Sequence, residues 1–319
     1  MNKQPIFILG FPRSGTTLLQ RILNSYDDVL IWGEHHGFLN PITKAYYWVL
    51  EGRQEEKAHL LAQPRVDWRS LPAEENNNRG GFSNQVWMNW FRAEEWKESF
   101  ERFMDVLFLP EGLPGKRFWG FKEVSYGSND RVIEFLKNIY PNAIFAFVIR
   151  NGFNVLANHR RMRADSDMKT DLWVCRDLCA MWKFQNEHFR HWHRSEKIRS
   201  FWIIYEELIQ GKGEINFLLE NMGKSFGKDQ RDVLESSAGR GSSFDNESYN
   251  DRWCTVPWYW LAVTYAMLGE MNRKMGFANP PIPPYRVFLG EAMIWFLRAA
   301  SFVCHSYMRV LKFFKAQAG

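Results

Sequence analysis

The fold is decided by residues 6–17, which read IFILGFPRSGTT. The first four of these residues are apolar without interruption, which is typical of a short strand that is buried on both faces. Gly10 and Gly15 bound a loop that contains a proline and an arginine, and residues 16–26 then carry apolar side chains at helical spacing. The stretch therefore predicts a buried strand, a glycine loop and a helix, in that order.

The loop of residues 10–17 nearly matches the phosphate-binding pattern G-x-x-x-x-G-K-[ST]. Such a loop turns successive main-chain N–H groups inward, and the N-terminus of the following helix adds partial positive charge, so phosphate oxygens bind there. Thr16 stands where the pattern has lysine, and the positive charge lies at Arg13 instead. We therefore expect a loop that holds a phosphate but is poorly suited to metal-assisted transfer of a γ-phosphate.

The rest of the chain alternates between short apolar runs and longer amphipathic segments. Further strands are expected at residues 29–32, 118–121, 143–149 and 201–205. Helices are expected over residues 37–50, 85–108, 130–140, from about 153, 171–194, 257–276 and 287–316. This alternation predicts the α/β class: a P-loop-type, mostly parallel sheet flanked by helices, with helical additions at the C-terminus.

We expect one P-loop domain over residues 1–286 and a separate aromatic, basic helix over residues 287–319. Within the domain, residues 52–108 are predicted to be an insertion on the acceptor side, and their first part, residues 52–82, is polar and irregular. Residues 278–286 contain four prolines and are predicted to be a linker.

Composition and charge narrow the class of partner. The chain has 319 residues, of which 16% are aromatic, so a large aromatic core or a stacking surface is expected. The net charge of +5 suits an anionic small molecule, and no nucleic-acid partner is expected. Four cysteines without a CxxC pair suit a reducing compartment and predict a cytoplasmic protein. No stretch is long and charge-free enough for a membrane span.

The glycine loop and three further motifs together resemble those of a known protein family. Residues 11–17 resemble the 5′-phosphosulfate loop of sulfotransferases that use 3′-phosphoadenosine-5′-phosphosulfate (PAPS). Residues 149–155, IRNGFNV, resemble the family signature that binds the 3′-phosphate, and residues 205–208, YEEL, resemble the motif near the adenine. The Gly-Glu pair at residues 33–34 is similar to the end of the second strand in the tyrosylprotein and bacterial branches. The resemblance covers about residues 5–210 and implies metal-free sulfuryl transfer from PAPS to an acceptor hydroxyl.

The resemblance also implies which residues bind the donor. The 5′-phosphate would be held by Pro12, Arg13, Ser14, Gly15, Thr16 and Thr17. Arg150 would clamp the 3′-phosphate, because its planar fork suits phosphate oxygens. Asn158 stands where the family usually has serine, and its amide can still donate a hydrogen bond. Tyr205 is either an adenine contact or a core aromatic, and Ser243 lies in a late loop that would close the site.

Two side chains are expected to perform the chemistry together with Arg13. Lys122 matches the position of a lysine near the bridging oxygen of the donor, so the resemblance implies stabilisation of the transition state. Glu34 would accept the proton of the attacking hydroxyl as general base. His35 and His36 are the rival bases, because a neutral imidazole suits this task at neutral pH.

Several alternatives stay open at the level of the sequence. One is a P-loop nucleotide-dependent kinase, against which the missing lysine argues, and another is a non-catalytic, membrane-associated protein that binds adenine nucleotides. The acceptor could be a carbohydrate, a lipid, a small molecule or a peptide. After Glu291 the chain has basic and aromatic but no acidic residues, which suits either peripheral membrane contact or packing against protein. The histidines of residues 188–193 lack ligands to complete a zinc set, so no metal is expected.

Overall fold

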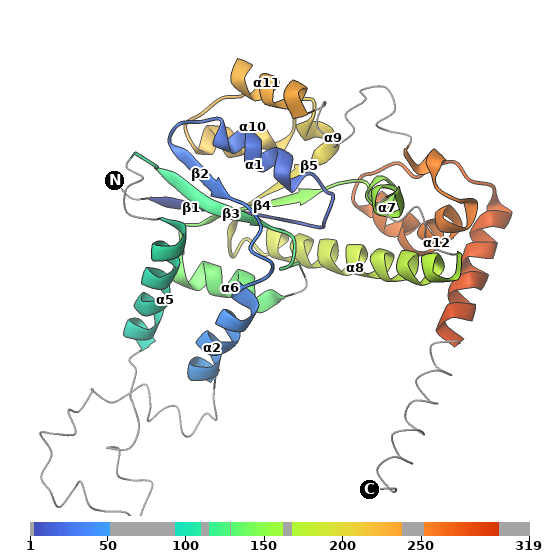
Figure 1. Ribbon diagram of the computed structural model, residues 1–319, viewed down its shortest axis with the longest axis horizontal. Coiled ribbons are helices and arrows are strands. Elements are labelled where there is room, and N and C mark those ends of the chain that lie inside the picture. Colours follow the sequence, from blue (N-terminus) through green and yellow to red (C-terminus); the bar gives the residue numbers. More distant parts are fainter. Residues whose placement is uncertain are drawn as a thin grey trace, which may run out of the picture.

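The computed structural model describes residues 3–51, 93–109, 115–127, 129–161, 168–237 and 252–299. Its centre is a sheet of five strands: β1 (Gln4–Gly10), β2 (Val29–Trp32), β3 (Phe118–Glu123), β4 (Ile144–Ile149) and β5 (Arg199–Ile204). The strand order is β2-β3-β1-β4-β5, and every neighbouring pair is parallel (Figure 1). The predicted α/β class with a parallel sheet is therefore confirmed.

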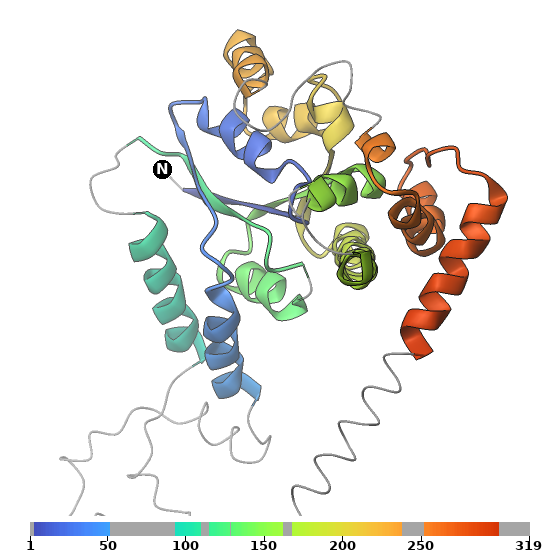
Figure 2. The same ribbon diagram turned by 45° about the vertical axis from the view of Figure 1, so that its right-hand side comes forward.

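Helices cover both faces of the sheet. One face carries α1 (Thr16–Asn24), α9 (Tyr205–Leu208), α10 (Glu214–Asn221) and α11 (Lys228–Ser237). The other face carries α2 (Leu39–Glu51), α5 (Ala93–Phe108), α6 (Asp130–Ile139) and α8 (Met168–Arg194). To one side lie α7 (Gly152–Arg161), a 3₁₀ turn (Arg252–Thr255), α12 (Trp258–Lys274) and a helix over residues 284–299 (Figure 2).

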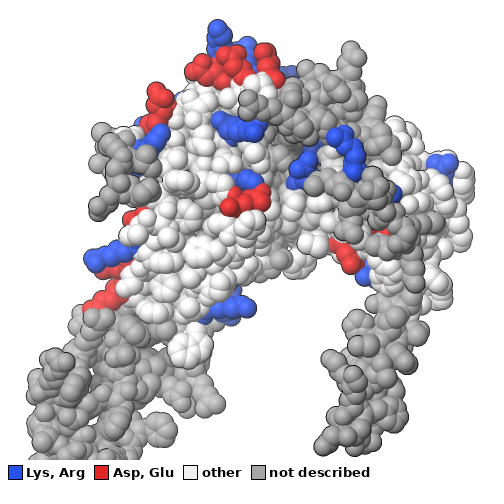
Figure 3. Space-filling view, viewed as in Figure 1, with Lys and Arg blue, Asp and Glu red and all other residues white. Residues whose placement is uncertain are grey.

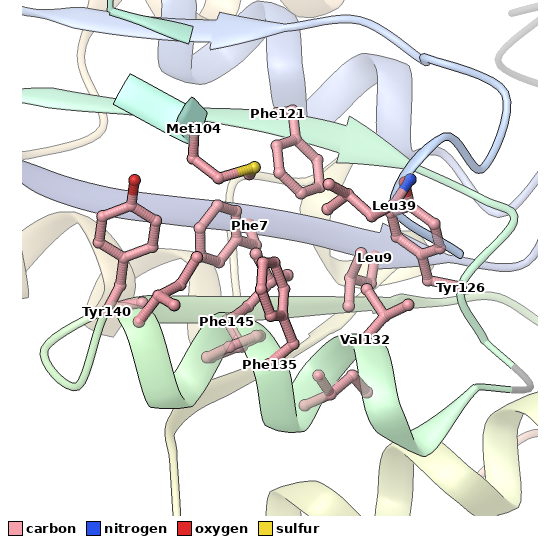
Figure 4. Packing of buried hydrophobic residues seen from close by; sticks show 14 of the residues in the cluster. Phe7, Leu9, Leu39, Met104, Phe121, Tyr126, Val132, Phe135, Tyr140 and Phe145 are labelled. Carbon is pink, nitrogen blue, oxygen red and sulfur yellow. The ribbon is translucent and has the colours of Figure 1, made fainter. Parts of the chain in front are cut away.

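The central strand β1 explains why the sheet needs helices on both faces. Its residues 6–9 are fully buried and alternate between two cores, one shared with α1 and α10 and the other with α6. In the second core, Phe7 lies between Phe121 of β3 and Phe145 of β4, above Phe135 of α6 (Figure 4). A continuous apolar run is the pattern that a strand covered on both sides requires.

The observed elements depart from the predicted ones in three respects. Tyr205 opens α9 and does not end β5. A helix begins at residue 284, inside the segment predicted to be a linker. Helices α10 and α11 were not predicted. The predicted irregular insertion over 52–82 lies outside the described residues, as does the start of the helix predicted over 85–108, of which α5 is the described part.

The helix over residues 284–299 packs against the rest of the fold. Its side chains Ile294 and Leu297 are buried, at 8% and 4% exposure, and Ile294 belongs to a core shared with α12. A Cβ atom on Gly290 would lie 2.2 Å from the carbonyl oxygen of Ala262, so the two helices are in close contact. The described part of the predicted C-terminal helix is thus continuous with the core of the domain.

The strand order places the candidate site. The chain leaves β1 for α1 on one face and leaves the neighbouring β3 for α6 on the other face (Figure 1). In open α/β sheets, ligands bind beyond the carboxyl ends of strands where such connections diverge. The glycine loop after β1, Lys122 at the end of β3 and Arg150 after β4 all come to this edge.

Candidate active site

The glycine loop has the sharp geometry that its sequence predicts. Arg13 and Gly15 have positive φ angles of 72° and 98°. A Cβ atom on Gly15 would lie 2.0 Å from Cδ2 of Tyr205, so the ring of Tyr205 lies directly against the loop. Glycine is therefore required at this position both by the backbone angle and by the close approach of the ring.

The start of α1 leaves hydrogen-bond donors available. In the described part of the chain, the N–H groups of Thr16 and Thr17 donate to no main-chain carbonyl, whereas Leu18 and Leu19 donate to Gly15. The hydroxyl of Ser14 is buried and has no hydrogen-bond partner among the described residues. Unsatisfied donors at a helix N-terminus attract anions, so these residues fit a phosphate group.

Two side chains that follow β4 hold the loop by its carbonyl groups. Arg150 Nη1 donates to the carbonyl of Arg13 at 3.1 Å, and its guanidinium lies 4.5 Å from the ring centroid of Tyr205. His159 Nε2 donates to the carbonyl of Pro12 at 3.3 Å. Burial lowers the pKa of His159, and the nearby charge of Arg13 adds to this effect, although the hydrogen bond to Pro12 opposes it, so the imidazole stays neutral at neutral pH.

His159 was not predicted as a site residue. It directly follows Asn158 in the helix after the 3′-phosphate signature, and that neighbourhood is the one signal that could have found it. Its contact with the loop joins residues that are 147 positions apart in the sequence, and no local pattern announces such a contact.

The start of α7, which lies two residues after Arg150, is positioned by side chains from two other elements. Asn151 N donates to Glu206 Oε1 of α9 at 3.1 Å, and Gly152 N donates to Asn272 Oδ1 of α12 at 2.9 Å. Burial raises the pKa of Glu206, although the hydrogen bond from Asn151 and the charge of Arg150 oppose that rise. The main-chain N–H groups at the start of α7 therefore donate to side-chain oxygens of the protein.

Glu34 and Lys122, which we predicted to be the general base and the transition-state cation, lie together in the structure. Lys122 Nζ donates to Glu34 Oε1 in an ion pair. The side chain of Lys122 is 7% exposed and that of Glu34 is 36% exposed, so the carboxylate is the member that solvent reaches. Lys122 is paired with Ile8 in the β1–β3 register, close to the start of the loop.

His35 is held by protein through both ring nitrogens. Nδ1 lies 2.8 Å from Glu123 Oε2, and Nε2 lies 3.1 Å from the hydroxyl of Tyr126. The carboxylate accepts and the hydroxyl donates, so neither nitrogen is available to take a proton from an acceptor. His36, the other rival base, is exposed and has a φ angle of 54°.

Asn158 and Tyr205, two more of the predicted residues, are buried, at 7% and 4% exposure. Arg160, which was not one of the predicted site residues, also lies on α7 and forms an ion pair with Asp171 of α8, Nε to Oδ2, at 2.6 Å, so its charge is directed toward that helix. Ser243 lies outside the described residues.

Three wider features of the described residues bear on possible partners. Figure 3 shows charged side chains scattered in small groups over one face, with a broad uncharged area between them and no continuous basic stripe among the described residues of that face. Within those residues, no three His, Cys, Asp or Glu side chains form a group that could hold a metal ion. None of the described helices combines the length and the apolar character that crossing a membrane requires.

Comparison with known proteins identifies the class. The model of the sulfotransferase family matches residues 5–223, which is more than half of the chain, so the protein belongs to the sulfotransferase family. The sulfotransferase domain from the Synechococcus PCC 7002 olefin synthase superposes with a TM-score of 0.52 at 17% identity, covering 88% of this chain and 97% of that one. At this identity, the superposition shows a common fold.

Other solved sulfotransferases superpose less closely. Sulfotransferase STF9 from Mycobacterium avium has a TM-score of 0.43 at 12% identity, covering 87% of this chain and 78% of that one. No match to the chain is found among curated proteins.

Proposed function

We propose that this sulfotransferase moves a sulfuryl group from PAPS to an acceptor hydroxyl, with Glu34 as general base. The observation that carries the proposal is that the ion pair of Glu34 and Lys122 and the glycine loop come to the same edge of the sheet. A phosphate cradle beside a cation and a carboxylate meets the needs of an in-line transfer between two oxygens.

The donor would be held by the loop and by residues after β4. The free N–H groups of Thr16 and Thr17, the Ser14 hydroxyl and the exposed Arg13 support binding of the 5′-phosphate. Arg150 and, on the following helix α7, Asn158 are our candidates for the 3′-phosphate, and the ring of Tyr205 would support the loop at Gly15.

The transfer step needs one base and one cation. A bond forms from the acceptor oxygen to sulfur while the bond from sulfur to the bridging phosphate oxygen breaks. Glu34 takes the proton of the acceptor, and Lys122 neutralises the charge that grows on the departing phosphate. The products are a sulfate ester and 3′-phosphoadenosine-5′-phosphate, and no metal enters this step.

Calorimetry with 3′-phosphoadenosine-5′-phosphate tests the donor assignment against its alternatives. We expect this nucleotide to bind far more tightly than adenosine monophosphate or than ATP with magnesium, and Arg150→Ala to abolish the preference. Equal affinity for all three would contradict the proposal, and preference for ATP with magnesium would favour a kinase. A panel of sugars, lipids, phenols and peptides with labelled PAPS would then find the acceptor class.

We also propose that the C-terminal helix contacts an anionic membrane surface. On the helix over residues 284–299, the side chains of Tyr285, Phe288, Trp295 and Phe296 are 59–72% exposed. After Glu291 the chain contains Arg298, Arg309, Lys312 and Lys315 and no acidic residue. Exposed aromatic rings beside basic residues suit the interface of a bilayer with anionic lipids.

A further inference from the structure

The carboxylate of Glu123, the residue directly after Lys122, accepts hydrogen bonds from five donors. Its Oε2 accepts from His35 N at 3.0 Å, from Gly37 N at 3.1 Å and from His35 Nδ1 at 2.8 Å. Its Oε1 accepts from Val124 N at 2.8 Å and from Ser125 N at 3.1 Å. The side chain is fully buried, so it acts on this segment and not on solvent.

These hydrogen bonds tie residues 33–37, the segment that carries Glu34, to the end of β3. Within the segment His36 and Gly37 have φ angles of 54° and 70°, in the left-handed region. A residue with a side chain enters this region at a cost of about 1–2 kcal/mol, so the conformation needs support from its surroundings. Glu123 supplies that support on both sides of His36.

The other end of the network reaches α2. The hydroxyl of Tyr126 donates to His35 Nε2 and accepts from Leu39 N at 2.8 Å, and Figure 4 shows Tyr126 beside Leu39. The His35 ring packs on Phe121 of β3, with centroids 4.5 Å apart. The segment is thus fixed before and after its turn, by polar and apolar contacts together.

A buried carboxylate is costly unless hydrogen bonds compensate for the loss of water. Burial alone would raise the pKa of Glu123, but the hydrogen bonds from His35, Gly37 and Val124 outweigh burial and hold the pKa well below its usual range. The group is ionised at neutral pH and acts as a permanent acceptor.

We propose that Glu123 is a positioning residue that fixes residues 33–37 so that Glu34 meets Lys122, with His35 and Tyr126 completing the support. This inference rests on the proposed role of Glu34 as general base. It assigns a function to the histidine next to that base: His35 orients the base and does not replace it.

The test compares Glu123→Gln with Glu34→Gln and wild type. The amide keeps the size of the carboxylate, but its NH₂ group cannot accept the donors it faces. We expect kcat with the best acceptor of the panel to fall about 100-fold, because small misplacements of a catalytic group cost about that much. Affinity for 3′-phosphoadenosine-5′-phosphate should stay within about twofold of wild type, because the network does not touch the glycine loop.

Two further variants separate positioning from general destabilisation. Glu214→Gln removes another carboxylate that accepts a main-chain N–H, that of Trp202 in β5 at 2.5 Å, and should leave kcat unchanged. Tyr126→Phe keeps the ring but removes the hydroxyl, and should lower kcat in the same direction by a smaller factor. If Glu123→Gln keeps the kcat of wild type while Glu34→Gln loses it, the positioning role is wrong.

Hydrogen–deuterium exchange supplies a readout that needs no substrate. Peptides spanning residues 33–40 should exchange faster in Glu123→Gln than in wild type, and unchanged exchange would overturn the inference. Should wild type neither bind 3′-phosphoadenosine-5′-phosphate nor transfer sulfate, the proposed function fails, whereas the exchange experiment still decides whether Glu123 orders the segment.

Discussion

At the scale of single residues, the ion pair of Glu34 and Lys122 defines the chemistry that the site can perform. The two residues are 88 positions apart in the sequence, yet they meet at the carboxyl ends of the paired strands β2 and β3. In the absence of substrate each charge compensates the other. With donor and acceptor bound, the lysine would face the leaving phosphate and the carboxylate would face the hydroxyl.

Replacing Glu34 by glutamine should slow transfer without weakening donor binding. A general base contributes about 10²- to 10⁴-fold to a rate, and we expect kcat to fall within that range. Single-turnover transfer from labelled PAPS and calorimetry with the product nucleotide measure the two effects. Glu220→Gln, at an exposed position of α10, is the matched control. An unchanged rate in Glu34→Gln would remove the assignment of the base.

The contact between Gly15 and Tyr205 predicts a different phenotype. Gly15→Ala combines a left-handed φ angle of 98° with a Cβ atom 2.0 Å from the Tyr205 ring. Gly223→Ala has a φ angle of 70° but no atom within 4 Å of the new Cβ. Each should lose about 1–2 kcal/mol of stability from the backbone, but only Gly15→Ala should lose nucleotide affinity. Thermal unfolding and calorimetry distinguish them, and normal binding by Gly15→Ala would contradict the close contact.

At the scale of elements, the last residues of β3 direct their side chains to both faces of the sheet. Successive side chains of a strand point to opposite faces. Phe121 belongs to the core beneath the sheet, so Lys122 points toward the face that carries α1, and Glu123 points toward the face of α2 and α6. In the proposed mechanism, two neighbouring residues would thus supply the cation of the site and the support of its base.

The low pKa of Glu123 predicts a loss of stability in acid. The pKa is lowered in the folded state and lies near 4.3 in the unfolded chain. Its stabilising contribution is therefore complete above about pH 5 and is lost as pH falls toward the folded-state pKa. Calorimetric Tm values from pH 7 to about pH 3 should fall more steeply for wild type than for Glu123→Gln, and parallel curves would contradict the prediction.

At the scale of the whole molecule, the helix over residues 284–299 is partly core and partly surface. Ile294 and Leu297 bind it to the domain, while Trp295 and Phe296 are 72% and 68% exposed. The helix lies at the side of the fold (Figure 2), and it is anchored there by two buried side chains while two of its aromatic rings are exposed.

Vesicle binding tests the proposed membrane contact. Wild type should sediment with vesicles that contain anionic lipid and much less with neutral ones, because basic residues and aromatic rings act together at the interface. The double variant Trp295→Ser, Phe296→Ser should lose this binding. Phe217→Ser, which removes a 61% exposed ring from α10, should not. Equal sedimentation of the double variant would show that this face is not the contact.

Local sequence was sufficient to predict the strands and the glycine loop. A continuous apolar run indicates a strand buried on both faces, and the glycines of the loop indicate its sharp turn, so neighbouring residues carry both signals. The local sequence was misleading at two other places. The prolines of residues 280–284 indicated a linker, yet a helix begins at Pro284, since proline is well suited to the first position of a helix. Tyr205 continues the apolar pattern of β5, yet it opens α9 and supports the glycine loop.

By itself, the sequence determined the α/β class and the glycine loop, because the residues of each pattern lie close together along the chain. It named Glu34 and Lys122 as separate candidates through the family resemblance, and the structure brought them together. Only the tertiary structure decided that His35 is bonded through both ring nitrogens, that His159 donates a hydrogen bond to the glycine loop and that Glu123 accepts hydrogen bonds from His35 and Gly37. Those contacts join residues about 90 to 150 positions apart, and parallel strands bring such residues together only when the whole sheet has formed.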